Sequence, residues 1–211
     1  MSQRAERLLQ PRMPIAIVRL DTLDDAVELS GALLAGGITT LEFTLTNKKA
    51  NDAITKVRQA FGDRLIVGAG TVLDGYNAAV SVDAGAQFLV TPLLVPDVIE
   101  AGKERNVPVV CGAFTPTEIW TASKLGADLV KVFPAGQLGP GYFKDILAPL
   151  PDLLLVPTGG VNLETCGQFL AAGAYTVAVG SQLISKEIVR TKDWDALTVL
   201  ARKYIEACVP A

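Results

Sequence analysis

Residues 125–135 read LGADLVKVFPA, and the order of these residues points to the fold. Gly126 comes directly before the apolar, partly β-branched run 127–133, and Pro134 ends that run. Glycine suits the left-handed turn that follows a helix, and a short run of this kind is typical of a strand buried on both faces. The stretch therefore predicts the passage from a helix into a buried strand.

The same pattern, with a glycine just before a strand, recurs along the chain. It appears as AGGI at 35–38, AGAQ at 84–87 and AGAY at 172–175. We interpret all four segments as the same helix-to-strand turn in four different units.

Eight strand-like runs alternate with helical patterns, which predicts right-handed βαβ units and a parallel sheet. The strands are expected at 15–19, 38–44, 65–69, 87–91, 108–112, 127–133, 153–157 and 175–180, with helices at 23–35, 49–60, 96–105, 117–125 and 163–172. We predict one α/β domain over residues 1–211, a (β/α)8 TIM barrel in which an N-terminal helix at 1–10 covers the bottom and 192–208 forms a closing helix. An open doubly wound sheet is the alternative, but no GxGxxG follows the first strand.

The composition limits the classes of function. Half of the 211 residues are hydrophobic, and the formal net charge of -3 disfavours nucleic-acid binding. No apolar run approaches the roughly 20 residues of a membrane span, and the first ten residues lack the apolar core of a signal peptide. Three scattered cysteines do not suggest a disulfide framework. We expect a cytoplasmic protein that binds neither nucleic acid nor membrane.

Histidine is absent from the sequence. This rules out Ser-His and Cys-His nucleophile pairs and removes the commonest ligand of transition metals. Any chemistry must use Lys, Glu, Asp, Tyr, Cys or Arg, and we expect neither a metal nor another cofactor.

Three charged residues interrupt the apolar strands near their carboxyl ends, where barrel enzymes place catalytic groups. They are Arg19, Glu42 and Lys131. Glu42 lies on the second strand and Lys131 on the sixth, and even-numbered strands share interior layers. The two side chains are therefore expected to face one another from opposite walls.

Such a pair suits Schiff-base chemistry. Burial among Leu129, Val130, Val132 and Phe133 should lower the pKa of Lys131, and a neutral amine can attack a carbonyl group. Burial should raise the pKa of the Glu42 carboxyl, which then can shuttle protons. Two simpler alternatives exist: the lysine can extend to solvent, and Glu42 can merely neutralise Arg19.

Two glycine-containing loops suggest a phosphate site. Thr158-Gly159-Gly160 follows the seventh strand, and Gly180-Ser181 follows the eighth. Barrels often bind phosphate on the backbone N–H groups of these two loops. The simpler alternative is a tight turn with Asn162 as a helix N-cap. The third-strand loop offers the hydroxyl of Thr71, and Phe133 shares the face of Lys131 and is expected to form an apolar wall.

Seven segments together resemble the 2-keto-3-deoxy-6-phosphogluconate (KDPG) aldolase family, which is also associated with 4-hydroxy-2-oxoglutarate aldolase activity. The segments are LEFT (41–44), VGAGTV (67–72), AGAQFLVTP (84–92), FTPTE (114–118), VKVFPA (130–135), PTGGVN (157–162) and VGS (179–181). The resemblance implies a metal-independent class I aldolase that is cytoplasmic and homotrimeric and acts on a phosphorylated keto acid.

The resemblance also implies roles for individual residues. Lys131 would form the Schiff base, and Glu42 would be the general acid and base. Thr71 would hold the carboxylate of the keto acid. The phosphate would bind at Gly159, Gly160 and Ser181, with Thr158 near the reacting hydroxyls.

One position departs from the family pattern. Well-known members carry an arginine four residues after the glutamate, where this chain has Thr46. We expect Arg19 to supply the missing cation, and the substitution leaves the preferred substrate open among KDPG, its galactonate epimer and 4-hydroxy-2-oxoglutarate. The residues alone also leave open a metal-free phosphosugar isomerase or epimerase and a non-catalytic barrel that binds phosphorylated metabolites.

Overall fold

The computed structural model describes residues 3–208, which form one sheet of eight parallel strands. The order along the sheet is β7-β6-β5-β4-β3-β2-β1-β8, so consecutive strands are neighbours apart from β8, which pairs with β1. The strands are β1 (Ile15–Val18), β2 (Thr40–Thr44), β3 (Ile66–Gly70), β4 (Leu89–Val90), β5 (Val109–Ala113), β6 (Leu129–Val132), β7 (Leu155–Pro157) and β8 (Ala178–Val179).

Contacts between β7 and β8 close the sheet. Thr158 and Ala178 form an isolated parallel bridge, and the backbone N–H of Tyr175 donates to the carbonyl of Leu155 at 2.8 Å. The sheet is therefore a nearly closed barrel, and the (β/α)8 fold expected from the sequence is confirmed.

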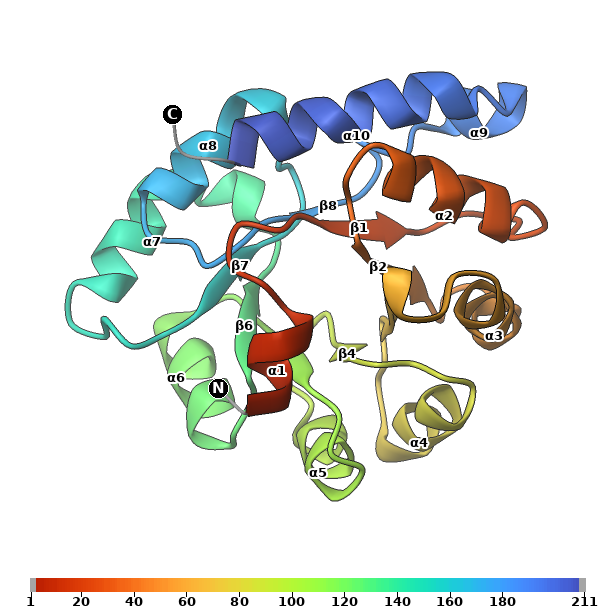
Figure 1. Ribbon diagram of the computed structural model, residues 1–211. Helices are drawn as coiled ribbons and strands as arrows, with labels where there is room; N and C mark the ends of the chain where they lie inside the picture. The colour runs from red at the N-terminus through yellow and green to blue at the C-terminus, as the bar shows by residue number, and fades with distance from the viewer. Residues whose placement is uncertain (1–2, 209–211) are drawn as a thin grey trace.

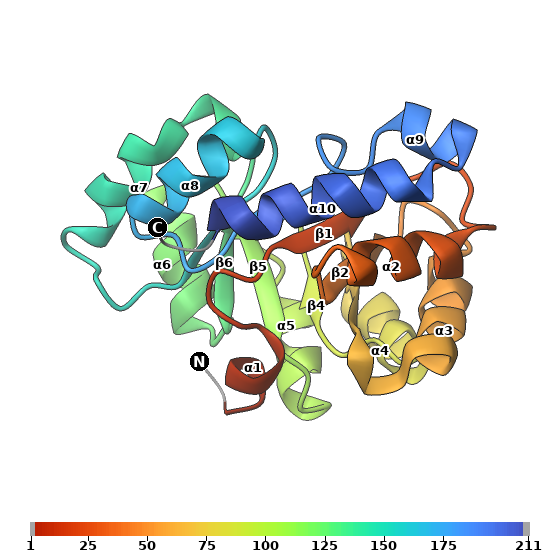
Figure 2. The same cartoon turned by 45° about the horizontal axis from the view of Figure 1, so that its top comes forward.

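Helices surround the strands in Figure 1, and the two views of Figure 1 and Figure 2 together show α1 at one end of the barrel. The helices are α1 (Gln3–Leu8), α2 (Ala26–Ala35), α3 (Ala50–Phe61), α4 (Gly75–Asp83), α5 (Pro96–Glu104), α6 (Pro116–Lys124), α7 (Gly139–Leu147), α8 (Leu163–Ala171), α9 (Lys186–Thr191) and α10 (Trp194–Cys208), with short 3₁₀ turns η1 (Gly62–Arg64) and η2 (Ala135–Gln137). Figure 2 shows α10 running alongside β1 between α8 and α2, where a closing helix is expected.

Strand alternation divides the apolar residues into two layers. One layer fills the barrel interior and includes Ile15, Phe88, Leu129 and Val156, with Leu9 covering it from below just after α1. The other layer packs between the outer face of the strands and the surrounding helices. The bottom of the barrel is therefore a packed core, which leaves the carboxyl ends of the strands for a site.

The four predicted turn glycines adopt the backbone conformation that the sequence indicated. Gly37, Gly85, Gly126 and Gly173 have φ angles of 96°, 105°, 93° and 99°. Residues with a Cβ rarely adopt such φ angles, so glycine at these positions made the turns predictable from the local sequence.

The structure corrects several boundaries. β1 ends at Val18, so Arg19 lies just beyond the strand, and the runs expected at 87–91 and 175–180 shorten to two-residue strands. Helices α4, α7 and α9 were not singled out in the sequence. Positions 1–2 of the expected N-terminal helix and 209–211 of the expected domain lie outside the described residues.

Candidate active site

Lys131 points into the barrel from β6. Its neighbours Val130 and Val132 belong to the outer apolar layer, whereas Leu129, two residues earlier, belongs to the interior. Alternation therefore places Lys131 on the interior face, where its side chain is only 6% exposed. Its Nζ lies 5.2 Å from the centroid of the Phe133 ring, within the range of a cation–π contact.

The residues that keep Lys131 dry are partly different from those expected. Val130 and Val132 face the helices, so they do not surround the amine. Its burial comes from the barrel interior, because neighbours along a strand point to opposite faces. The alternative that Lys131 extends to solvent is wrong, since the side chain is buried.

Glu42 occupies the interior face of β2. Leu41 and Phe43 on either side pack in the outer layer, and Glu42 is 1% exposed. Among residues 3–208, none donates a hydrogen bond to its carboxyl group, and Oε2 is fully buried. The carboxyl group is thus dry and has no hydrogen-bond partner among these residues.

Burial and mutual attraction act on this pair in opposite directions. Burial lowers the pKa of Lys131, Glu42 raises it in part, and the cation of Arg19 lowers it further. Burial raises the pKa of Glu42, and Lys131 opposes that rise. Because burial is the largest cause for both groups, the neutral amine and the protonated carboxyl are favoured. A neutral amine is a nucleophile, and a carboxyl with a raised pKa can exchange protons.

Arg19 follows β1 at the mouth of the barrel and continues the alternation that turns Ile15 inward. It is exposed, and within the described part of the chain it forms no ion pair. The idea that Glu42 neutralises Arg19 is therefore not supported. The charge of Arg19 lowers the pKa of Lys131. Because Arg19 has no carboxylate partner among the described residues, its guanidinium can meet an anion.

Thr71 stands at the mouth, directly after β3, with a φ angle of 56°. A β-branched residue rarely adopts a left-handed conformation, and such strain clusters at functional sites. Next to it in the sheet order, Thr44 of β2 is buried, and its hydroxyl lies 2.8 Å from that of Thr46. We did not single out Thr44 from the sequence, although its two-residue spacing from Glu42 indicates the same interior face.

The two glycine loops lie side by side at the mouth. The Thr158–Ala178 bridge joins their strands just before Gly159-Gly160 on one side and Gly180-Ser181 on the other. Gly159 and Gly160 have φ angles of 80° and 82°, which turns the backbone sharply. Gly160 and Ser181 are exposed, and their backbone N–H groups donate to no group within residues 3–208. Such amides can receive a phosphate.

The N-cap expected at Asn162 is also present. Its side chain accepts hydrogen bonds from the backbone N–H groups of Glu164 and Thr165, both at 3.0 Å. The cap and the glycine turn are compatible, because the cap fixes the start of α8 while the glycines precede it. Thr158 is buried at the end of β7.

Phe133 connects the lysine to the first glycine loop. A Cβ added at Gly159 would lie 3.0 Å from the Phe133 ring, so the loop packs directly against the aromatic side chain. The same ring faces Nζ of Lys131. The Phe133 ring therefore lies close to both the amine and the loop.

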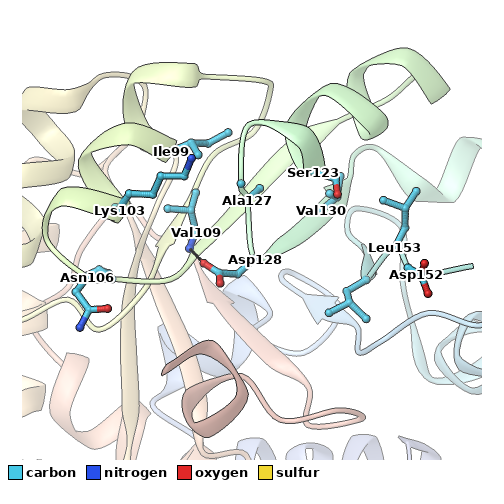
Figure 3. Close-up of a pocket in the computed structure, with 14 residues that line it drawn as sticks. Ile99, Lys103, Asn106, Val109, Ser123, Ala127, Asp128, Val130, Asp152 and Leu153 are labelled. Carbon is cyan, nitrogen blue, oxygen red and sulfur yellow. Dashed lines mark hydrogen bonds between the residues drawn. The ribbon is translucent and has the colours of Figure 1, made fainter. Parts of the chain in front are cut away.

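A groove of about 430 Å³ lies elsewhere, at the amino ends of β5 to β7 (Figure 3). It is lined by residues of α5, α6 and the adjoining loops, including Lys103, Ser123 and Asp152. Asp128 in this groove accepts a hydrogen bond from the backbone N–H of Val109 at 3.0 Å, a contact that holds the start of β5. The groove contains neither Lys131 nor Glu42, so it is separate from the barrel mouth.

Two further findings concern the part of the chain that the structure describes. No helix between residues 3 and 208 is long and apolar enough to cross a membrane. Within the same residues, no group of three His, Cys, Asp or Glu side chains is arranged to hold a metal ion.

Comparison with known proteins adds independent findings. The chain matches the aldolase family described as KDPG and KHG aldolase over residues 6–200. It is 32% identical over 193 residues to the 2-dehydro-3-deoxy-phosphogluconate aldolase of Haemophilus influenzae, with 91% of each chain covered. It is 35% identical over 176 residues to the 2-dehydro-3-deoxy-6-phosphogalactonate aldolase of Escherichia coli (strain K12), with 82% of this chain and 86% of the relative covered.

A solved structure is similar over nearly the whole chain. It is the KDPG aldolase from Legionella pneumophila with pyruvate captured as a covalent carbinolamine intermediate. The TM-score is 0.87 at 28% identity, with 95% of this chain and 97% of that chain covered. Fold and site together define the class, a class I aldolase, which breaks carbon–carbon bonds through a Schiff base. Within that class, the chain belongs to the KDPG and KHG aldolase family.

Proposed function

We propose that this aldolase cleaves 2-dehydro-3-deoxy-6-phosphogluconate to pyruvate and glyceraldehyde 3-phosphate, with Lys131 as the nucleophile and Glu42 as the proton carrier. The observation that carries the proposal is a buried amine inside the barrel mouth whose pKa is lowered and which interacts with a buried carboxyl. The Legionella relative supports the chemistry, since it holds pyruvate as a covalent carbinolamine.

The reaction begins with the attack of the Lys131 amine on the C2 keto carbon. Glu42 relays protons through a water while the resulting carbinolamine loses water and becomes an iminium. Removal of the proton from the C4 hydroxyl then breaks the C3–C4 bond, and the bonding electrons pass into the iminium. Glyceraldehyde 3-phosphate leaves, the enamine takes a proton at C3, and hydrolysis releases pyruvate and the free amine. Even a modest enzyme must lower the barrier by at least ~8 kcal/mol in this way.

The remaining site residues hold the two ends of the substrate. Arg19 and Thr71 bind the carboxylate at the mouth, and Phe133 forms the apolar wall beside the reacting carbons. The backbone of Gly159 and Gly160 and the Gly180-Ser181 turn bind the phosphate, with Thr158 near the hydroxyls. The sharp backbone turns at both glycines and the exposed amides of Gly160 and Ser181 support this assignment.

Trapping with borohydride tests the covalent step. Incubation with pyruvate and sodium borohydride should add one reduced pyruvyl group to Lys131, located by peptide mass spectrometry. Lys131→Ala should give no adduct and no turnover, whereas Lys124→Ala, which removes a surface amine, should retain both. An adduct on another lysine, or none on the wild-type chain, rules the proposal out.

Arg19 has its own test. If it binds the keto-acid carboxylate, Arg19→Ala should raise the Michaelis constant for pyruvate in the condensation direction about 10-fold or more, as expected for loss of a charge-assisted hydrogen bond. An unchanged constant would remove Arg19 from the site and leave the Lys131 proposal standing.

The galactonate epimer is a second candidate substrate, because the E. coli relative named for it is 35% identical to this chain. We compare kcat/KM for the two 6-phosphates and for 4-hydroxy-2-oxoglutarate under one set of conditions. The highest value for the gluconate form supports our proposal. A preference for the unphosphorylated 4-hydroxy-2-oxoglutarate would show that the two glycine loops do not serve as a phosphate site.

We also propose that the chain forms a homotrimer through a rim patch, defined as Leu73, Tyr76, Leu93, Phe114 and Trp120. All five are large, exposed hydrophobic residues, with Tyr76 78% exposed. They follow β3, β4 and β5, three strands that are adjacent in the sheet. Large apolar side chains exposed at one end of a barrel are typical of sites of protein association.

A further inference from the structure

We propose that Gly70 is a positioning residue for catalysis: the missing side chain at position 70 creates the space that holds the Glu42 carboxyl in line with Lys131. This inference rests on the proposed role of Glu42 as proton carrier. It assigns a role in proton transfer to a residue that bears no functional group.

Gly70 and Glu42 are brought together by the pairing of β2 with β3. In the register of this pair, Glu42 lies beside Gly68 and Thr44 lies beside Gly70. Paired residues share a face of the sheet, so Gly68 and Gly70 both face the interior beside Glu42. Gly70 is the diagonal neighbour of Glu42 on the side of the barrel mouth.

The Glu42 carboxyl fills the space that a side chain at position 70 would occupy. A Cβ built on Gly70 would lie 2.6 Å from Oε2, 2.7 Å from Cδ and 3.0 Å from Oε1 of Glu42. These carboxyl atoms are the three nearest neighbours of the added atom, and the first two distances are shorter than real contacts allow. The carboxyl group therefore packs directly on the backbone of β3.

The attraction between this carboxyl group and Lys131 is not directional, so it does not by itself fix the rotamer of the side chain. No residue of the described chain donates a hydrogen bond to it, and Oε2 is completely enclosed. A side chain that ends in a freely rotating carboxyl takes the position that packing leaves open. The space at Gly70 is consequently what determines where the carboxyl sits relative to Lys131.

The backbone conformation at position 70 does not itself require a glycine. Unlike Gly159 and Gly160, Gly70 does not have a left-handed φ angle, so an alanine fits its conformation. Its interior neighbour Gly68 is under a different restriction, because a Cβ there would lie 2.5 Å from the ring of Phe88, which is locked in the barrel core. Gly68→Ala must disturb the core, whereas Gly70→Ala has only to push aside the end of a flexible side chain.

The expected result of Gly70→Ala is a folded enzyme with an intact nucleophile and an impaired proton relay. Turnover should fall by about 10²-fold, the contribution typical of a positioned general acid or base. Lys131 should still be trapped by borohydride with pyruvate, because the nearest neighbours of an added Cβ at position 70 are the carboxyl atoms of Glu42 and not the amine. The melting temperature should fall much less than in Gly68→Ala.

The decisive experiment is a double-mutant cycle with Glu42→Asp, whose shorter side chain withdraws the carboxyl from the added methyl group. We expect Gly70→Ala to cost less than about 3-fold in kcat in the Glu42→Asp background, compared with about 10²-fold in the wild-type background. Gly75→Ala, where an added Cβ has its nearest neighbour at 3.5 Å, serves as the control and should keep normal turnover.

Each other outcome overturns the inference. Equal losses in both backgrounds would mean that Gly70 acts independently of Glu42, and normal turnover in Gly70→Ala would mean that the space is not required. A loss of stability equal to that of Gly68→Ala would mean that the carboxyl cannot move aside. Failure of the proposed function is distinct, because then even the wild-type chain would not be trapped with pyruvate.

Discussion

At the residue scale, the chemistry proposed for this aldolase depends on two ionisable groups held away from water. Burial works against the charge on both Lys131 and Glu42, and their mutual attraction restores only part of what burial removes. Burying this pair therefore lowers the stability of the fold, while it provides the protonation states that the proposed reaction needs. Such a trade-off between stability and activity is common.

The charge of Arg19 should be visible in the pH dependence of the reaction. Arg19 lowers the pKa of Lys131, so Arg19→Gln should raise that pKa. Because only the unprotonated amine attacks, the acidic limb of kcat/KM should move to higher pH. Glu42 raises the same pKa, so in the residual activity of Glu42→Gln the limb should move to lower pH.

The measurement is kcat/KM as a function of pH for the wild-type chain, Arg19→Gln and Glu42→Gln. Arg190→Gln is the control, because this arginine pairs with Glu187 on the exposed surface, and its limb should not move. A shift of both site variants in the same direction would contradict the electrostatic account.

Removing both buried ionisable groups should stabilise the fold. The raised pKa of Glu42 gives stability at low pH that is lost as the pH rises through the folded pKa. The lowered pKa of Lys131 means that stability is lost as the pH falls from the ordinary lysine value of 10.5 toward the folded pKa. The two pKa shifts therefore reduce the free energy of unfolding of the wild-type chain most at neutral pH, which lies between the folded-state titration of Glu42 and that of Lys131.

We expect the double variant Lys131→Met, Glu42→Gln to be inactive and more stable by about 1–4 kcal/mol at neutral pH. Urea unfolding followed by circular dichroism measures the difference, with the wild-type chain at the same pH as reference. A double variant less stable than the wild type would show that the pair contributes to folding.

At the element scale, parallel strands bring side chains from distant segments to one end of the barrel, and helix caps hold the loops between them. The loop that carries Gly159 and Gly160 runs directly into the Asn162 cap of α8. Helix α6 begins with a similar capping box, in which Thr115 and Glu118 bond each other's backbone N–H groups. The two caps therefore offer a matched comparison.

Asn162→Ala and Thr115→Ala should each reduce the free energy of unfolding by about 1 kcal/mol, because each leaves helix N–H groups without a partner. Only Asn162→Ala should also weaken the binding of the phosphorylated substrate, since only that cap adjoins the proposed phosphate loop. Urea unfolding and the Michaelis constant give the two values. An equal rise in the Michaelis constant for both variants would separate the phosphate site from α8.

At the scale of the whole molecule, the Thr158–Ala178 bridge joins the two ends of the sheet, while the rim patch leaves apolar side chains in solvent. Exposed apolar patches are typical of surfaces that associate with a partner. A second and third copy of the chain would cover the rim patch.

Light scattering with size-exclusion chromatography tests the assembly. The wild-type chain should have the mass of three copies, and Trp120→Glu should weaken the association by at least about 30-fold, as for a central aromatic residue of an interface. Val199→Glu is the control, because Val199 is exposed on α10 outside the rim patch. A monomeric wild-type chain would refute the trimer.

The predictions that succeeded from sequence rested on local rules. The four turn glycines required a left-handed backbone, and the two-residue strand period placed Lys131 and Glu42 on the interior face. Both features depend on residues within a few positions of one another, so their physical cause is present in the chain before it folds. The family motifs added the expected roles.

Other features exist only once distant segments meet. Arg19 lies beyond β1 because the β1 ladder ends at Val18, and the valines beside Lys131 turn outward because of strand alternation within the closed sheet. The fit of the Glu42 carboxyl against Gly70 joins two strands 28 positions apart and depends on their exact register. Local sequence carries backbone preference and periodicity, whereas register, closure and the space between side chains arise from packing between residues far apart in the chain.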